Sequence, residues 1–236
     1  MLESGIEFDY PDLGVVHIVV RPNSRHISAR WRDGKIYLNI PRGLRFEDVM
    51  PVLEEMAPRL IQRKPFLMYH DGQELDFGQL TVIIQRQSHS PSKILAQAHI
   101  PVSSIEVGYG WDFNTEDTSR AISNYLCRIA QRLASNLLIP RARQLAQSVN
   151  AVPTGWRIST GHHVLGQCNT TGIISLSYML VFLPQHLQDY IIYHELAHLS
   201  EMNHSPRFHA LCDSYCCGNE ALYIRELHHF KWPVIR

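Results

Sequence analysis

The segment from Tyr193 to Ser205, YHELAHLSEMNHS, contains three histidines and two glutamates, residue types that bind metals and transfer protons. His194 and His198 are four residues apart, which places both imidazoles on one face of a helix, one turn apart. Glu195 lies roughly 100° round the helix from His194, beside the open position of a shared metal ion. There its carboxylate can accept a proton from water. The spacing therefore predicts a metal site that activates water.

A hydrolytic zinc site needs a third protein ligand. Glu201 continues the face of His194, but on a straight helix it would stand ~10 Å further along the axis. Asn203 suits the left-handed residue that ends a helix, and Ser205-Pro206 is typical of an N-cap followed by a first helical position. His204 therefore lies in a turn between two helices, and we expect its imidazole to complete the site.

The helix that carries the motif is predicted to begin at Pro184, and its helical pattern extends to Met202. It is apolar on two faces, which predicts a buried helix. The preceding stretch GIISLSY, Gly172–Tyr178, alternates like a half-buried strand. Residues 155–172 are predicted to be rich in loops.

A long helix is predicted upstream, from an N-cap at Asn114 or Thr115 to about Leu138. Pro140 is predicted to break it, with a short helix continuing through Asn150. The apolar stripe of the long helix consists of Ile122, Leu126, Ile129, Leu133 and Leu137.

The first ~110 residues have strand-like patterns. The runs Val15–Val20 and Lys35–Ile40 flank an Asp33-Gly34 turn signal, and Asp71-Gly72 is a second such signal before Leu80–Gln85. Between them, residues 45–64 are predicted to form a helix despite Pro51 and Pro58.

These patterns place a boundary near residues 108–114 and predict an α+β protein. A β-rich N-terminal region would span residues 1–110, and a second domain, which carries the histidine motif, residues 111–236.

Composition limits the classes of partner. The 236 residues include 45% apolar and 19% charged residues, as in globular proteins. Lys+Arg and Asp+Glu number 22 each, so no net charge favours binding to nucleic acid or an anionic membrane. No apolar run approaches the ~18–20 residues of a membrane span. The acidic N-terminal stretch predicts no signal peptide, and five cysteines favour reduced thiols in a cytoplasm.

The segment HELAHLSEMNHSPRFHAL, His194–Leu211, resembles the H-E-L-x-H, Asn-His-Ser and Phe pattern of the YgjP-like metallopeptidases. The stretch SRHISARWRDGKIYLNIPRGL, Ser24–Leu44, resembles the N-terminal hairpin of that family. GIISLSYMLVFLPQHLQDYIIY, Gly172–Tyr193, resembles the strand and the helix start before the motif. The resemblance covers about residues 15–230 and implies a zincin fold, related to the SprT-like and Wss1-like metallopeptidases.

Carried over residue by residue, the resemblance implies that His194, His198 and His204 bind Zn²⁺ and that Glu195 is the general base of peptide hydrolysis. It also implies that the strand over Gly172–Tyr178 presents an open edge to an extended peptide or protein substrate.

The chain departs from the family in one segment. The family usually has Trp-Gly-Ser-Cys before its Gly-x-Ile-x-Leu-Asn strand. VLGQCNTTGIISLS keeps Gly166 and Cys168 but lacks the Trp and the Ser, and Ser177 stands where Asn is usual.

Two other functions stay open. A metal-dependent nucleoside triphosphate hydrolase would use the same activated water, but the sequence has no P-loop and only scattered arginines such as Arg141, Arg143 and Arg207. A non-catalytic zinc-binding interaction domain is the third function. Glu195 argues against it, because a structural zinc site has no use for a base.

Several further side chains have open roles. Candidates for stabilising the oxyanion are Arg157, His162, His163 and Tyr178. Glu220 or Glu226 could replace His204 as the third ligand. His209, Cys212 and Cys216 fall at helical spacing, with Cys217 adjacent, and they either hold a second zinc ion or pack in the core.

Overall fold

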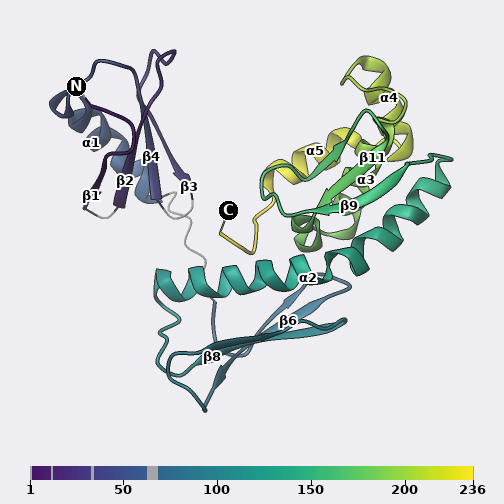
Figure 1. Ribbon diagram of the computed structural model, residues 1–236, viewed down its shortest axis with the longest axis horizontal. Coiled ribbons are helices and arrows are strands. Elements are labelled where there is room, and N and C mark those ends of the chain that lie inside the picture. Colours follow the sequence, from purple (N-terminus) through teal and green to yellow (C-terminus); the bar gives the residue numbers. More distant parts are fainter. Residues whose placement is uncertain (1, 12, 33–34, 63–68, 236) are drawn as a thin grey trace. The chain divides into compact units, whose positions relative to one another are not determined.

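A computed structural model describes residues 2–11, 13–32, 35–62 and 69–235. The chain forms two compact units, which are described separately: Met1–Phe66 with Ile235–Arg236, and Leu67–Val234. The described residues form five α-helices and three β-sheets (Figure 1). The predicted α+β class is confirmed.

The first unit is a four-stranded sheet with one helix. Its elements are β1 (Glu7–Tyr10), β2 (Gly14–Val20), β3 (Ser28–Arg32), β4 (Lys35–Ile40) and α1 (Phe46–Gln62). The strand order is β1-β2-β4-β3. The two predicted strands are present, but β2 and β4 pair in parallel, and β3 is the antiparallel neighbour of β4. The predicted Asp33-Gly34 turn lies outside the described residues.

This unit has its own hydrophobic core between the sheet and α1. Alternate residues of β4 are buried, and they pack with residues of α1 such as Val49 and Leu53. Pro51 and Pro58 lie inside the helix, as expected. Both are exposed, so they sit on the face of α1 that looks away from this core.

The second unit begins with another four-stranded sheet, in the order β5-β6-β8-β7. Its strands are β5 (Gln73–Asp76), β6 (Thr81–Gln87), β7 (Ile94–Gln97) and β8 (Val102–Gly108). The Asp71-Gly72 turn is present, with Gly72 at φ 75°, and it leads into β5. This sheet shares a buried core with the following helix, and both belong to the compact unit that begins at Leu67.

The helix α2 (Glu116–Ser148) follows, with Thr115 as its N-cap. The predicted apolar stripe is buried along it. The predicted break at Pro140 is wrong, because the helix continues through it. Pro140 and Asn136, whose carbonyl loses its helical donor, are both exposed, so water can satisfy that carbonyl. Buried residues on both sides of the proline keep the helix packed.

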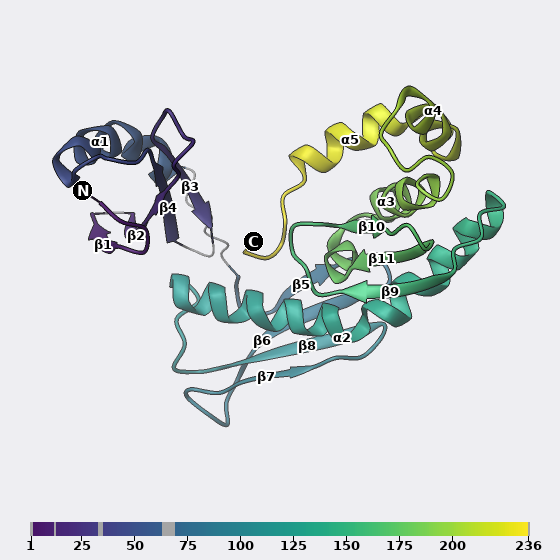
Figure 2. The same ribbon diagram turned by 45° about the horizontal axis from the view of Figure 1, so that its top comes forward.

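The rest of the second unit contains the elements that carry the histidine motif and their neighbours: β9 (Gly155–Ser159), β10 (Gly166–Cys168), β11 (Ile173–Ser177), the 3₁₀ turn η1 (Tyr178–Phe182), α3 (Gln185–Ala197), α4 (Pro206–Tyr215) and α5 (Glu220–His229). Figures 1 and 2 show α2 running between the β5–β8 sheet and this group. It contacts β7 and β8 on one side, and β9, η1 and α3 on the other.

Residues 155–172 are rich in loops, as predicted, since ten of these 18 residues lie outside strands; the segment also contains the strands β9 and β10. One expectation about the second sheet of this unit is corrected. β11 is a strand as predicted, but it is central in the order β10-β11-β9, antiparallel to β10 and parallel to β9. It has no open edge, because its backbone groups pair on both sides.

Within the described part of the chain, no helix combines the length and the apolar character that a membrane span requires. All five cysteines are free.

Candidate metal centre

The helix α3 places His194 in a half-buried position and His198 in a buried one. Leu187, Ile191, Ile192 and Leu196 are buried, which confirms the predicted burial of this helix. The helix ends at Ala197, with His198 as its C-cap, earlier than the predicted Met202. Asn203 is not left-handed as predicted: among the described residues, only Asn150 and Cys217 have positive φ without being glycine. The chain instead reverses in a turn after His198, in which backbone N–H groups of residues 199–201 donate to the carbonyls of Leu196 and Ala197.

The reversal brings three histidines together. Ring nitrogens of His194, His198 and His204 all lie within 4.8 Å of one another. His194 Nε2 and His204 Nε2 are 3.1 Å apart. Two nitrogens bound to one tetrahedral zinc ion at ~2.0–2.1 Å would be about 3.3 Å apart. The donor set therefore fits a divalent metal in both chemistry and spacing.

The aromatic ring of Phe208 packs against all three imidazoles of this triad. Its ring is fully buried, and its centroid lies 4.8, 4.4 and 4.8 Å from those of His194, His198 and His204. It is positioned by α4, which begins as predicted: Ser205 is the N-cap, its hydroxyl accepts from the Phe208 N–H, and Pro206 follows. His204 is exposed, so the triad opens to solvent on its side.

The environment favours neutral imidazoles, the form that binds metals. Burial, followed by the neighbouring histidines, lowers the pKa of His194 to about 4. Burial also lowers the pKa of His198. His198 Nδ1 lies 3.1 Å from the Glu201 carbonyl oxygen, so that nitrogen donates and Nε2 keeps its lone pair. His194 Nδ1 is buried and has no hydrogen-bond partner among the described residues.

Glu195 lies against β10. Its carboxylate accepts a hydrogen bond from the Cys168 backbone N–H, and burial raises its pKa to about 7 despite that bond. A Cβ on Gly166 would come within 2.5 Å of Glu195 Oε1, so only glycine leaves room for the carboxylate. The residues Gly166 and Cys168, noted in the sequence only as parts of a family segment, thus hold the proposed base. Phe208 and these two were the site contacts that spacing alone did not reveal.

A second donor group shares His194 with the triad. His194, Cys212 and Glu220 each offer one ligand atom, and these three atoms lie within 4.8 Å of one another. Cys212 and Cys216 are buried in the core, as one of the two open interpretations expected. His209 Nδ1 lies 3.0 Å from Glu220 Oε1.

The remaining candidates lie in other settings. Tyr178 is fully buried, and its hydroxyl is 3.1 Å from His162 Nε2, so it cannot reach a substrate without moving. Arg141 binds both carboxylate oxygens of Asp189, at 2.9 and 2.6 Å, which leaves it no role in a phosphate cradle. Arg157 and His163 are exposed. Glu226 pairs with His186 at 2.6 Å.

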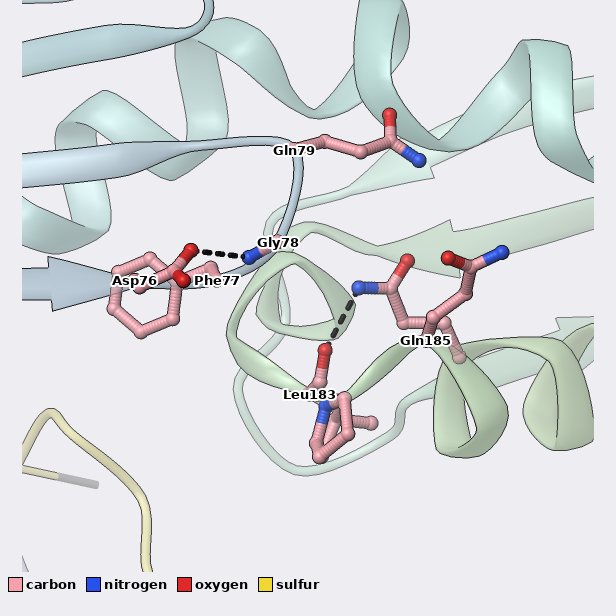
Figure 3. Close-up of a pocket in the computed structure, with 8 residues that line it drawn as sticks. Asp76, Phe77, Gly78, Gln79, Leu183 and Gln185 are labelled. Carbon is pink, nitrogen blue, oxygen red and sulfur yellow. Dashed lines mark hydrogen bonds between the residues drawn. The ribbon is translucent and has the colours of Figure 1, made fainter.

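A pocket of about 200 Å³ lies elsewhere in the second unit (Figure 3). It is lined by the end of β5, the turn after it and the chain entering α3. Asp76 accepts from the Gly78 N–H, and Gln188 donates to the Leu183 carbonyl. These bonds occupy polar groups of the wall, and the lining includes no residue of the triad.

The comparison with protein families agrees with the motif. The YgjP-like family, metallopeptidase domain, matches residues 25–223. A solved structure, described as the metallopeptidase zymogen of Pyrococcus abyssi abylysin, has 21% identity, covers 39% of this chain and 91% of its own, and superposes with a TM-score of 0.35. No protein with a curated description gives a significant match.

The family match extends over most of the chain and contains the histidine triad, Glu195 and the strands that hold them. The chain therefore belongs to the YgjP-like family of metallopeptidase domains.

Proposed function

We propose that this protein is a zinc-dependent metallopeptidase in which His194, His198 and His204 bind the metal and Glu195 is the general base. The observation that carries the proposal is the convergence of three imidazoles from α3 and the following turn, beside a buried carboxylate. Three histidines with a position left for water are typical of catalytic rather than structural zinc sites.

A zinc ion held by the triad would supply a Lewis acid that acidifies water and polarises the scissile carbonyl. Glu195 accepts the proton of the attacking water and passes it to the leaving amine. The Cys168 N–H fixes the carboxylate in place for both transfers. Phe208 holds the three imidazoles in their relative positions.

An extended peptide would bind along β10 in this proposal. β11 pairs on both sides, whereas β10 is an edge strand of the same sheet and contacts α3. A peptide that adds to β10 as a further strand would pass close to Glu195, which lies against Gly166. We further propose that residues 111–236 form the peptidase domain, since every residue named in the mechanism lies there. We also propose a cytoplasmic location, which the five free thiols support.

The first test combines metal content with peptide turnover. We expect zinc in the purified protein, with one equivalent lost in His204→Ala, measured by mass spectrometry. With casein or a mixed peptide library as substrate, Glu195→Gln should lower turnover by roughly 10²–10⁴-fold while zinc is retained. The matched control is Glu201→Gln, which keeps the backbone carbonyl that contacts His198 and should leave turnover unchanged.

Other outcomes identify the alternatives. Nucleoside triphosphate turnover that is lost in Glu195→Gln, without peptide turnover, would replace the peptidase by a nucleotide hydrolase. Zinc bound with neither activity would favour an interaction domain. No zinc in the wild type, even after zinc is added back, would refute the proposed centre.

A further inference from the structure

Behind the triad, three helices bring together a second set of metal-binding side chains. His194 comes from α3, Cys212 from α4 and Glu220 from the first residue of α5. The chain returns sharply between α4 and α5, where Cys217 and Gly218 have φ values of 53° and 82°. The helices α3, α4 and α5 contact one another (Figure 2).

We propose that Cys212, Glu220 and His194 form a second site for a borderline-soft divalent cation such as zinc, cobalt or cadmium. Their donor atoms lie within 4.8 Å of one another. Sulfur, carboxylate oxygen and imidazole nitrogen are the donors that zinc prefers. Donors around one zinc ion stand about 3.3–3.7 Å apart, so small side-chain rotations close the set.

His194 explains why this second set should bind a cation. If Nε2 faces the triad, Nδ1 is the nitrogen left for another partner. That atom is buried and has no hydrogen-bond partner among the described residues, whereas an Nδ1–H behind a metal-bound histidine ordinarily donates to an oxygen. A cation bound to Cys212 and Glu220 would satisfy this nitrogen, and His194 would then bridge two ions.

The surroundings of Glu220 and Cys212 suit ligands rather than solvated groups. Glu220 is 6% exposed and Cys212 is fully buried. His209 contacts Glu220 Oε1 at 3.0 Å, and the Asp213 carboxylate accepts from the Glu220 N–H at 3.0 Å, so Glu220 is held at both its side chain and its backbone. Cys216, one helical turn from Cys212 and in side-chain contact with its thiol, is the candidate fourth ligand. Binding would displace two protons to solvent, the thiol proton of Cys212 and the Nδ1 proton of His194, which would bridge the two ions as an imidazolate.

Cobalt titration of the full-length chain tests the proposal, after removal of bound metal and with a non-coordinating reductant. A thiolate ligand gives Co²⁺ a charge-transfer absorption in the near ultraviolet, which imidazoles do not. We expect the wild type to bind two equivalents, one of which brings this absorption. The double variant His198→Ala/His204→Ala should bind one equivalent of Co²⁺ and should retain the charge-transfer absorption. This variant separates the second site from the proposed catalytic centre.

Single variants identify the ligands. Cys212→Ser should abolish or strongly reduce the absorption, and Glu220→Gln should weaken binding of the equivalent that carries it by at least about 10-fold. The matched control is Cys127→Ser, a buried cysteine on α2, which should keep the absorption unchanged. Circular dichroism checks that each variant is folded.

Three results would overturn the second site. The first is the absence of charge-transfer absorption in the folded wild type. The second is an absorption of wild-type intensity in Cys212→Ser, and the third is loss of the absorption in the folded double variant. If Cys212→Ser does not fold, alkylation of the wild type decides. It is carried out in a denaturant concentration at which the metal-free protein exposes Cys212 to the reagent, because this thiol is fully buried in the native fold. Cadmium should then protect Cys212 from the reagent, as mapped by peptide mass spectrometry, and an unprotected Cys212 would refute the site.

Discussion

At the scale of single residues, the proposed base depends on what surrounds it. Glu195 is 5% exposed, and a carboxylate removed from water has a raised pKa, here about 7. The Cys168 N–H opposes that effect and fixes the oxygen to which it donates. The same side chain would be an ordinary solvated glutamate on an exposed helix. Its chemistry therefore depends on β10 as much as on the spacing of the motif.

Gly166 provides the sharpest residue-level prediction. A methyl group there would meet the Glu195 carboxylate at 2.5–2.8 Å and force it away from the Cys168 N–H. We expect Gly166→Ala to lower kcat by roughly 10²-fold, since small displacements of a catalytic group have effects of that order. Zinc content should be unchanged, because the atoms that the added methyl group would meet belong to Glu195 and not to the three histidines.

The control for this variant is Gly161→Ala. A Cβ on Gly161 would meet no atom within 4 Å, so its kinetics should match those of the wild type. Steady-state peptide hydrolysis measured on both variants checks the expectation. Equal activity of Gly166→Ala and wild type would mean that the carboxylate does not need its place beside β10.

At the scale of elements, α2 and α3 form the frame that holds the site. Arg141 on α2 and Asp189 on α3 make a bidentate ion pair, and their side chains are only 26% and 16% exposed. Fork-shaped pairs of this kind fix geometry as well as adding stability. Asp189 precedes His194 by about one and a half helical turns on α3, so the pair anchors the helix that carries the first two histidines of the triad.

We expect Arg141→Ala to lower the free energy of unfolding by about 1.5–3 kcal/mol, because it leaves a largely buried carboxylate without its charged donor. Arg143→Ala, at an exposed position on the same helix, should change stability by less than about 0.5 kcal/mol. Urea unfolding followed by circular dichroism compares the two. Equal stabilities of the two variants would show that the ion pair contributes nothing measurable.

At the scale of the whole molecule, the described residues form two hydrophobic cores. One lies within β1–β4 and α1, and the other extends over both remaining sheets and the helices of the second unit. The histidine triad belongs to the second unit. A metal bound there stabilises only the fold that presents the three imidazoles together.

Calorimetry should therefore resolve two unfolding transitions, of which zinc moves only one. At zinc concentrations about 100–1,000 times the dissociation constant, we expect roughly 3–4 kcal/mol of added stability in that transition. A chelator should reverse the shift. In the double variant His198→Ala/His204→Ala, the shift should shrink to whatever the second site provides. A zinc shift of equal size in both transitions would contradict the assignment of the site to one unit.

How far the sequence determines this protein can be judged from α3 and its flanks. The spacing of His194 and His198 fixes their common face, because helical geometry is set by the backbone. Ser205 and Pro206 fix the start of α4, because capping is a local interaction between neighbours. The alternation of β11 and the apolar stripe of α2 likewise predict which residues are buried. These features depend on residues close together in the chain.

Other features depended on contacts between distant segments. Pro140 does not break α2, because Pro140 itself is exposed and the buried residues of α2 before and after it stay packed in the core. The pairing of β11 with β10 and β9, and the parallel pairing of β2 with β4, follow from strand order that no local pattern encodes. The sequence by itself thus identified the three candidate ligand histidines and the proposed base. Only the tertiary structure decided that Gly166 and Cys168 hold Glu195, and that Cys212 and Glu220 lie behind His194, because those contacts join separate elements through packing.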